Sequence, residues 1–267
     1  MIEEEPVRPS GAGSRLLRTA LIGAIVVVLS GAGLLGALNY LDASCNPLGR
    51  VACTRVLFVG NSYTYVNDLP TVFRHLARAA GENVETAMVA QGGETLAQHV
   101  STGDAPGPIA EARWQFVVLQ EQSEIPAVAA LRSSEFYPAV RTLVGDIRQA
   151  GGTPVLLETW AHQAGWSDDG LSYGSMQTAL DQGYATIGGP LGVVVAPAGQ
   201  AWQAAIRIDP GIALWQADGS HPTLAGTYLV ASVLFSRIFG YSPVGISDTE
   251  GLPSAVAREL QQASIQQ

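Results

Sequence analysis

The sequence predicts one α/β domain built on a parallel β-sheet, preceded by a single N-terminal helix that crosses a membrane. From about residue 54 onward, uninterrupted apolar runs alternate with helical patterns. Most of the apolar runs are rich in β-branched residues and do not alternate with polar ones, as is typical of parallel strands covered on both faces. Residues 19–41 contain no charged side chain. As a helix, the 19 residues of 20–38 would span about 28 Å, close to the ~30 Å hydrocarbon core of a bilayer.

The hydrophobic stretch sets the predicted domain organisation. Three arginines precede it and an aspartate follows it, so the positive-inside rule places residues 1–18 in the cytoplasm and residues 42–267 outside. We expect a signal anchor over 19–41, a linker over 42–53 and the folded domain over 54–267. The alternative is a cleaved signal peptide and a secreted domain, although such peptides usually have an apolar region of only ~7–15 residues.

The two cysteines of the chain lie in the predicted linker. Cys45 and Cys53 bracket a short loop that contains proline and glycine. In an oxidising compartment they could form a disulfide, which would stabilise the domain by about 2.5 kcal/mol. Unpaired thiols are the alternative. A metal site is not expected here, because no histidine or further cysteine lies nearby in the sequence.

Composition excludes several classes of protein. The chain is 47% hydrophobic and only 14% charged, which is incompatible with an intrinsically disordered protein. Its formal net charge is −9, and a protein that binds the phosphate backbone of a nucleic acid needs a basic surface instead. We therefore expect no nucleic-acid partner.

The strands and helices follow from the hydrophobic pattern in chain order. Five apolar runs predict the strands, at 55–60, 84–90, 116–120, 153–159 and 192–198. The first helix is capped by Asp68, runs over 69–80 and ends at Gly81. Later helices are expected at about 135–150, 173–187, 200–207 and 223–239, with a short one in the last 15 residues.

Turns that carry polar residues follow the predicted strands, and the first two of them contain glycine. They lie at 60–64, 91–95, 121–123, 160–162 and 200–202, and a sixth polar turn lies at 218–222. In an open parallel sheet, ligands bind beyond the carboxyl ends of the strands. The chemistry of this protein is therefore expected at that edge of the sheet.

Ser62 is the first candidate nucleophile, because it follows the first strand. A serine hydroxyl is a weak nucleophile that needs a base within hydrogen-bond reach, itself held by a third group. Asp218 and His221 suit these two roles, since a carboxylate three residues before a histidine in a turn can reach one of its ring nitrogens. Taken singly, each residue could equally be an ordinary turn or capping residue.

Four short motifs together resemble the SGNH/GDSL hydrolase superfamily. They are GNSYT (60–64), GGET (92–95), LQEQS (119–123) and DGSHP (218–222), and the resemblance spans about residues 55–239. It implies a flavodoxin-like three-layer α/β/α sandwich with a five-stranded sheet, and a serine hydrolase that acts on carboxylic esters without a cofactor or metal. Ser62 would be the nucleophile, His221 the general base and Asp218 its orienting partner.

The resemblance also implies an oxyanion hole. Its donors would be the backbone N–H groups of Ser62 and Gly93 and a side-chain amide from the third motif. The superfamily usually has Gly-x-Asn-Asp there, whereas this chain has Gln-Glu-Gln-Ser. Aligning the motifs places Gln122 at the asparagine, with Gln120 as the alternative donor. The first motif also differs, with Asn61 where the commonest form has aspartate.

Four residues near the ends of the strands are candidates for the substrate pocket: Asn61, Trp160, His162 and Trp202. The tryptophans could hold a sugar ring or an acyl chain, or could pack in the core. The leading hypothesis is a membrane-tethered extracytoplasmic serine esterase whose partners are the membrane and a small-molecule or carbohydrate ester, acetyl esters of carbohydrates among them. The alternatives are an acyltransferase on a surface polysaccharide and a catalytically silent module that binds glycans. The substrate and the oligomeric state remain open.

Overall fold

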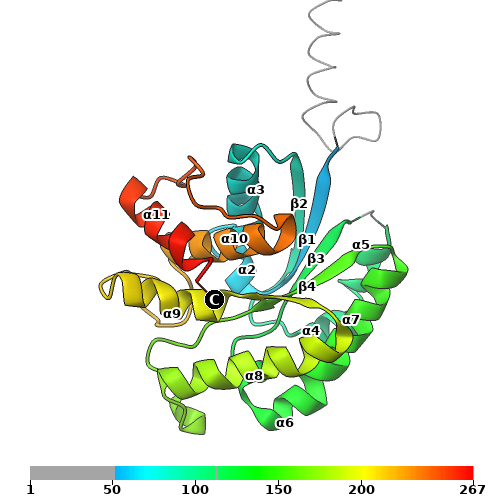
Figure 1. Cartoon of the computed structure of the whole chain (residues 1–267). Helices are drawn as coiled ribbons and strands as arrows, with labels where there is room; N and C mark the ends of the chain where they lie inside the picture. The colour runs from blue at the N-terminus through cyan, green and yellow to red at the C-terminus, as the bar shows by residue number, and fades with distance from the viewer. Residues whose placement is uncertain (1–51, 112–113, 267) are drawn as a thin grey trace, which may run out of the picture. The chain divides into compact units, whose positions relative to one another are not determined.

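A five-stranded parallel sheet in the order β2-β1-β3-β4-β5 lies at the centre of the domain. The computed structural model describes residues 52–111 and 114–266, and it is drawn in Figure 1. The five strands are β1 (Thr54–Gly60), β2 (Val84–Ala90), β3 (Phe116–Gln120), β4 (Thr153–Glu158) and β5 (Val194–Pro197). All five predicted strands are confirmed, with ends that differ by at most two residues. The strand order is that of flavodoxin-like folds.

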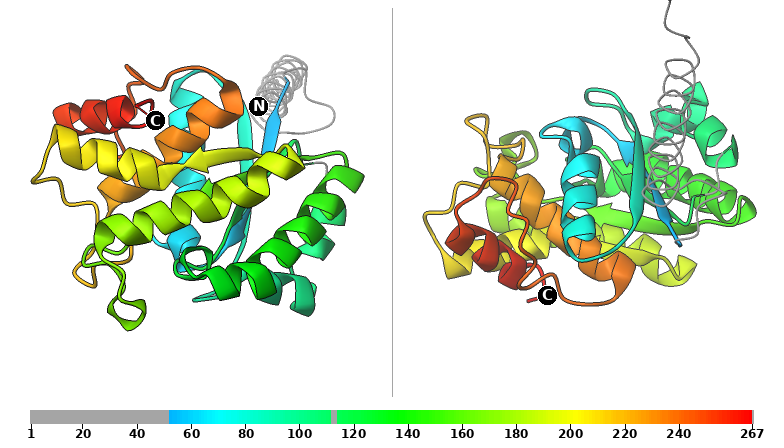
Figure 2. Two further views of the ribbon diagram at one scale, coloured as in Figure 1. Left: turned by 60° about the horizontal axis from the view of Figure 1, so that its bottom comes forward. Right: turned by 90° about the horizontal axis from the view of Figure 1, so that it is seen from above.

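Helices cover both faces of the sheet, so the predicted three layers are confirmed (Figure 1). On one face lie α3 (Leu69–Ala79), α9 (Ala198–Ile208), α10 (Leu224–Phe239) and α11 (Ser254–Ala263). On the other lie α4 (Leu96–Thr102), α5 (Pro106–Glu111), α7 (Tyr137–Gln149) and α8 (Tyr173–Leu191). Two further views show the same arrangement (Figure 2).

The inner strand β1 explains why both faces must be covered. Val56 and Phe58 belong to the core cluster on the α3 and α10 side, and Leu57 and Val59 belong to the cluster on the α4 and α7 side. Successive side chains of a strand point to opposite faces. A strand with four apolar residues in a row therefore needs apolar helices on both sides.

The predicted helices are present, and the structure adds short ones that the hydrophobic pattern did not reveal. The short α-helices are α2 (Ser62–Tyr65), α4, α5 and α6 (Ala129–Leu131). The structure also has the 3₁₀-helices η1 (Ile125–Ala127) and η3 (Ser167–Asp169) and the π-helix η2 (Arg132–Phe136). Helices of one or two turns show too few repeats for a 3.6-residue period to be recognised. Helix α8 also runs past its predicted end, through Pro190 to Leu191.

The predicted cytoplasmic tail, the anchor over 19–41 and nearly all of the linker lie outside the described residues. The same is true of Cys45, so its pairing with Cys53 stays a prediction. Within residues 52–111 and 114–266, no helix is long and apolar enough to span a bilayer.

Candidate active site

The turn that follows β1 presents Ser62 at the carboxyl edge of the sheet. Asn61 caps the short helix α2, and its Oδ1 accepts a hydrogen bond of 3.1 Å from the backbone N–H of Tyr63. Gly60 must lack a side chain, because a Cβ there would overlap Gln120 Oε1. Ser62 is thus the first residue of a helix at the point where the strand order reverses between β1 and β3, which is the usual ligand-binding position in open α/β sheets.

His221 and Asp218 meet Ser62 at this edge. His221 Nε2 lies 2.9 Å from Ser62 Oγ, and His221 Nδ1 lies 2.6 Å from Asp218 Oδ2. The other carboxylate oxygen of Asp218 accepts hydrogen bonds from the backbone N–H groups of Ser220 (2.9 Å) and His221 (3.0 Å). The Ser220 N–H and then His221 lower the pKa of Asp218, although burial opposes them. The structure therefore brings the three predicted residues together as a carboxylate, an imidazole and a hydroxyl in series.

The turn that carries His221 is held from several directions. Trp160 Nε1 donates a hydrogen bond of 3.0 Å to the Ser220 carbonyl, and the hydroxyls of Tyr63 and Ser220 lie 2.6 Å apart. The N–H of Gln163 donates to the carbonyl of Gly219 at 2.8 Å. The position of the imidazole is therefore set by contacts from the turns after β1 and β4 as well as by its own turn.

A cavity of about 280 Å³ opens at this site. It is lined by Asn61, Ser62, Tyr63, Gly93, Gln122, Ser123, Glu124, Ser220 and His221, most of which carry polar side chains. Five of the residues singled out in the sequence are among them. His162 lies beside the cavity, where its Nε2 is 3.2 Å from Ser123 Oγ, and burial lowers the pKa of His162.

Hydrogen-bond donors face the cavity from three strand ends. The backbone N–H groups of Ser62 and Gly93 donate to no acceptor in the part of the chain that the structure describes. Gln122 Oε1 accepts from the N–H groups of Glu124 (2.8 Å) and Ile125 (3.2 Å), and its Nε2 donates to Glu124 Oε2 at 3.0 Å. An amide nitrogen carries two hydrogens, so one remains for a ligand in the cavity.

Solved structures with the same fold were found by comparison. A protein from Slackia heliotrinireducens assigned to the SGNH hydrolases is 29% identical, with a TM-score of 0.58 over 70% of this chain and 100% of its own. A DUF4886 family protein from Bacteroides uniformis is 17% identical, with a TM-score of 0.71 over 80% of this chain and 93% of its own. An acetyl-xylooligosaccharide esterase from Geobacillus, studied as a mutant, is 13% identical, with a TM-score of 0.54 over 70% and 94%.

This chain belongs to the SGNH/GDSL hydrolase superfamily. Its enzyme class is that of the serine carboxylic ester hydrolases. No family model and no curated protein matches its sequence.

Gln120 does not line the cavity of this SGNH hydrolase, so it is not the alternative oxyanion donor. It is only 1% exposed, and all its hydrogen bonds serve the nucleophile turn and its own loop. Its Oε1 accepts from the Asn61 N–H (3.0 Å) and from Thr64 Oγ1 (2.8 Å). Its Nε2 donates to Asn61 Oδ1 (3.0 Å) and to the Glu121 carbonyl. Gln120 is the last residue of β3, whereas Gln122 lies in the turn beyond the strand, where the alternation of strand side chains no longer fixes its direction.

The prediction that Trp160 and Trp202 line the pocket is wrong. Both are fully buried, and Trp160 stacks between Tyr63 (ring centroids 4.5 Å apart) and Trp202 (4.1 Å). Large aromatic rings contribute much stabilisation when they are removed from water, and here they form a stacked column beside the turn that carries Ser220 and His221. Asn61 does line the cavity, but the partners of its side chain are Tyr63, Gln120 and the Glu94 carbonyl (3.0 Å).

Several residues of the site were not singled out in the sequence. Glu124, Ser123 and Ser220 line the cavity. Glu121 lies behind it, where its Oε1 accepts from the N–H groups of Gln122 (2.7 Å) and Leu96 (3.1 Å), and burial raises its pKa to about 7. Ser123, Ser220 and Glu121 lie within the recognised motifs and Glu124 follows the third one directly, so the motifs themselves were the available signal.

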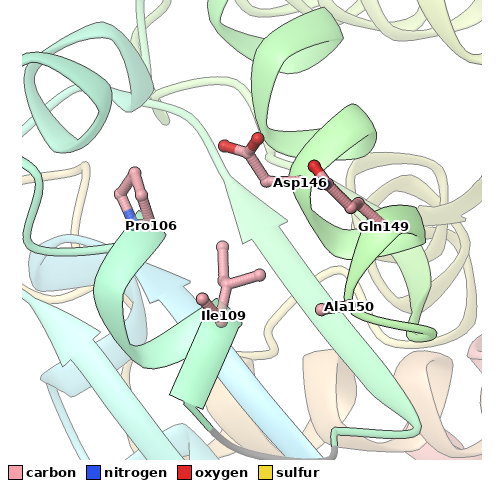
Figure 3. A pocket seen from close by; sticks show the side chains of 6 residues that line it. Pro106, Ile109, Asp146, Gln149 and Ala150 are labelled. Atoms are coloured by element: carbon pink, nitrogen blue, oxygen red, sulfur yellow. The ribbon is translucent and has the colours of Figure 1, made fainter.

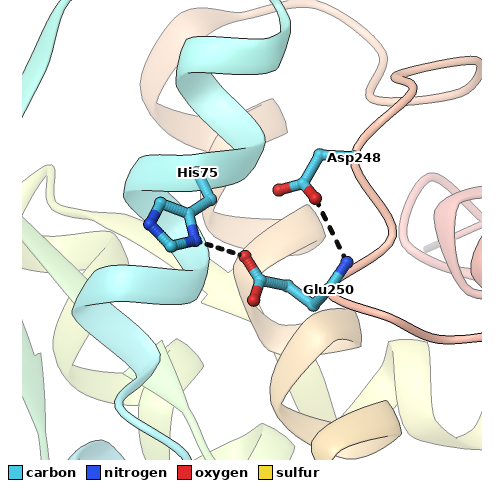
Figure 4. A group of neighbouring side chains, drawn as sticks. All are labelled: His75, Asp248 and Glu250. Carbon is cyan, nitrogen blue, oxygen red and sulfur yellow. Dashed lines mark hydrogen bonds and ion pairs between the residues drawn. The ribbon is translucent and has the colours of Figure 1, made fainter.

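Two other features lie outside this cavity. A larger one of about 420 Å³ lies between α5 and α7, with Ile109 and Asp146 in its lining (Figure 3), but it holds no nucleophile beside a base. On α3 and the loop before α11, His75 Nδ1 lies 2.8 Å from Glu250 Oε1, and Asp248 Oδ1 accepts from the Glu250 N–H at 3.2 Å (Figure 4). Neither feature shares a residue with the cavity beside Ser62.

Proposed function

We propose that this SGNH hydrolase is a membrane-tethered extracytoplasmic esterase that uses Ser62, His221 and Asp218 to hydrolyse short-chain carboxylic esters. The observation that carries the proposal is the series of contacts of 2.9 Å and 2.6 Å that joins Ser62 Oγ through His221 to Asp218. This series opens onto a polar cavity at the carboxyl edge of the sheet.

The chemistry follows from these contacts. His221 Nε2 takes the proton of Ser62 as Oγ attacks the ester carbonyl, and it then returns the proton to the leaving alcohol. Asp218 accepts the Nδ1–H of His221, which holds the ring in the tautomer that has a free lone pair on Nε2 and stabilises the imidazolium once formed. In the second half-reaction His221 removes a proton from water as the water oxygen attacks the acyl carbonyl. His221 then returns the proton to Ser62 Oγ as the bond to the acyl group breaks and the carboxylic acid leaves.

The negative charge on the substrate oxygen would be stabilised by the N–H groups of Ser62 and Gly93 and by Gln122 Nε2. One such donor contributes about 3–4 kcal/mol, equivalent to about 10²–10³ in rate. Gln122 is longer by one methylene than the asparagine usual at its position. The contacts of its amide with Glu124 and Ile125 hold that longer side chain in place.

The cavity supports a short acyl group and a hydrophilic alcohol, such as an acetyl ester of a carbohydrate. Its volume is about 280 Å³, and within the described residues none of the lining side chains is aliphatic. A long acyl chain would find no aliphatic side chain to pack against in this small cavity. Two of the structural neighbours carry names of acetyl xylan or acetyl-xylooligosaccharide esterases, which agrees with this substrate class.

The membrane tether is the uncharged stretch 19–41, with residues 42–267 outside the cytoplasm. Cells that express the full chain should keep it in the membrane fraction after a high-salt wash. An external protease should digest the domain in intact cells. Recovery of the chain in the culture medium would support cleaved export instead.

Fluorophosphonate labelling followed by mass spectrometry tests the nucleophile. We expect the label on Ser62 and loss of p-nitrophenyl acetate turnover in Ser62→Ala and His221→Ala. Ser133→Ala is the matched control, because Ser133 is an exposed serine in η2, away from the cavity. Undiminished turnover in a folded Ser62→Ala protein would refute the proposal. Faster release of the acyl group to a sugar hydroxyl than to water would indicate the acyltransferase instead.

A further inference from the structure

A buried histidine lies directly behind the proposed oxyanion hole. His99 on α4 is fully buried, and its ring lies between three oxygens. Its Nε2 is 2.8 Å from the carbonyl of Gly60, and its Nδ1 is 2.9 Å from Asp104 Oδ1 and 3.5 Å from Glu94 Oε2. The esterase mechanism above does not use this residue.

The partners of the ring define its protonation state. A backbone carbonyl and a carboxylate only accept hydrogen bonds, so each ring nitrogen must carry a hydrogen. Burial raises the pKa of Asp104, but hydrogen bonds from the His99 ring, Thr102 and the Ala105 backbone lower that pKa overall, which favours the carboxylate. With an oxygen acceptor at each ring nitrogen, these contacts favour the form of His99 that carries both hydrogens.

Two carboxylate oxygens depend on this positive charge. Glu94 Oε2 and Asp104 Oδ2 are buried and have no hydrogen-bond partner within the described residues. A buried carboxylate without compensation costs several kcal/mol. The imidazolium between Glu94 and Asp104 supplies that compensation.

The contacts of His99 reach both turns that supply the backbone donors. Gly60 lies two residues before Ser62, and Glu94 directly follows Gly93. The two turns are also joined by the hydrogen bond of 3.0 Å from Asn61 Nδ2 to the Glu94 carbonyl. A positive charge at His99 thus holds together the segments whose N–H groups face the cavity.

We propose that His99 is a positioning residue: as a buried imidazolium shared by Gly60, Glu94 and Asp104, it holds the nucleophile turn in register with the turn of Gly93. This inference rests on the proposed esterase function. His99 does not line the cavity. Its loss should therefore lower kcat and leave KM nearly unchanged.

The inference implies a pH dependence. When His99 loses a proton, it can no longer donate to both Gly60 and Asp104, and the neighbouring carboxylates lose their counter-charge. The turnover number should therefore fall on the alkaline side of the profile. The charged groups on the elements packed around α4 are Glu121 after β3, Arg132 and Glu135 in η2, and Arg141, Asp146 and Arg148 in α7. Among the described residues, only Glu94 and Asp104 have ion-pair contacts with the ring.

Nitrogen-15 NMR of the imidazole groups provides the direct test. In the Ser62→Ala protein, which keeps the fold without turnover, both ring nitrogens of His99 should be protonated at neutral pH. His99→Gln identifies the signal by its absence. One unprotonated ring nitrogen at neutral pH would overturn the proposal. So would a divalent metal bound stoichiometrically to the wild type and absent from His99→Gln.

Kinetics provide the second test. His99→Gln should lower kcat about ten- to hundredfold, the loss expected when a remote change misplaces catalytic groups. This substitution should also abolish the fall of kcat at alkaline pH. Asp104→Asn keeps the histidine but weakens its charge, so the alkaline fall should move to lower pH. If His99→Gln does not fold, the pH profile of kcat in Asp104→Asn and the NMR spectrum still test the proposal.

The matched control is His75→Gln, because His75 also pairs with a carboxylate but contacts no residue of the cavity (Figure 4). It should leave kcat and the pH profile unchanged. The proposal is overturned if His99→Gln keeps kcat within about twofold of the wild type and has the same profile. Failure of the esterase function would instead appear as the absence of Ser62 labelling in the wild type, so the two failures are distinguishable.

Discussion

Replacing Gln120 by leucine should destabilise the fold, whereas the same change at Gln122 should mainly reduce turnover. Gln120→Leu removes the hydrogen bonds to the Asn61 N–H, Asn61 Oδ1, Thr64 Oγ1 and the Glu121 carbonyl, all four in the buried interior. At about 1 kcal/mol each, with the added cost of leaving buried partners unsatisfied, the loss is about 3–5 kcal/mol. For a domain of this size, that corresponds to a melting temperature lower by about 10 °C.

Gln122→Leu removes contacts within one turn at the edge of the cavity, so its cost in stability should be about 1 kcal/mol. If Gln122 donates to the oxyanion, kcat for p-nitrophenyl acetate should fall about 10²–10³-fold. The two variants are compared by urea unfolding followed by circular dichroism and by initial rates below the melting temperature.

An exchange of the two effects, with turnover lost in Gln120→Leu and stability lost in Gln122→Leu, would refute the roles assigned to these glutamines. A Gln120→Leu protein that unfolds like the wild type but has lost turnover would make Gln120 the donor after all. A Gln122→Leu protein with unchanged kcat would exclude Gln122 from the oxyanion hole.

Three further predictions follow from the geometry. Asp218→Asn should fold normally but lower kcat about 10³–10⁴-fold in initial-rate assays, because its amide would donate to His221 Nδ1 and leave the proton on Nε2; a loss below about tenfold would contradict this. Burial raises the pKa of Glu158 to about 9, above its value in the unfolded chain, so the folded state keeps a proton that the unfolded state releases. The stability of the wild type should therefore fall relative to Glu158→Gln as pH rises from about 5 to about 9, and parallel urea-unfolding curves across that range would contradict it. Trp160→Ala should cost about 3–5 kcal/mol in thermal unfolding, because it removes the ring between Tyr63 and Trp202; a loss below about 1 kcal/mol would show that the column is not needed for stability.

Much of the fold was predictable because it depends on local sequence. The five strands are apolar runs, and most are rich in β-branched residues, so their positions follow from residue type without knowledge of their neighbours. Parallel strands place all their carboxyl ends at one edge. That geometry predicted that Ser62 and the turn of His221 would lie near each other, although 159 residues separate them along the chain.

The remaining features depended on which way side chains point after distant segments have packed. Gln120 and Gln122 are both amides two positions apart, but only the structure shows that one holds Asn61 and the other faces the cavity. Only the structure likewise shows that Trp160 is buried and that the partners of His99 come from three different turns. The amino-acid sequence sufficed to predict the strands, the edge of the sheet that carries the polar turns and the residue types present there. Tertiary structure alone decided each side chain's partners, because burial and hydrogen bonding at such sites are set by segments far apart in the chain.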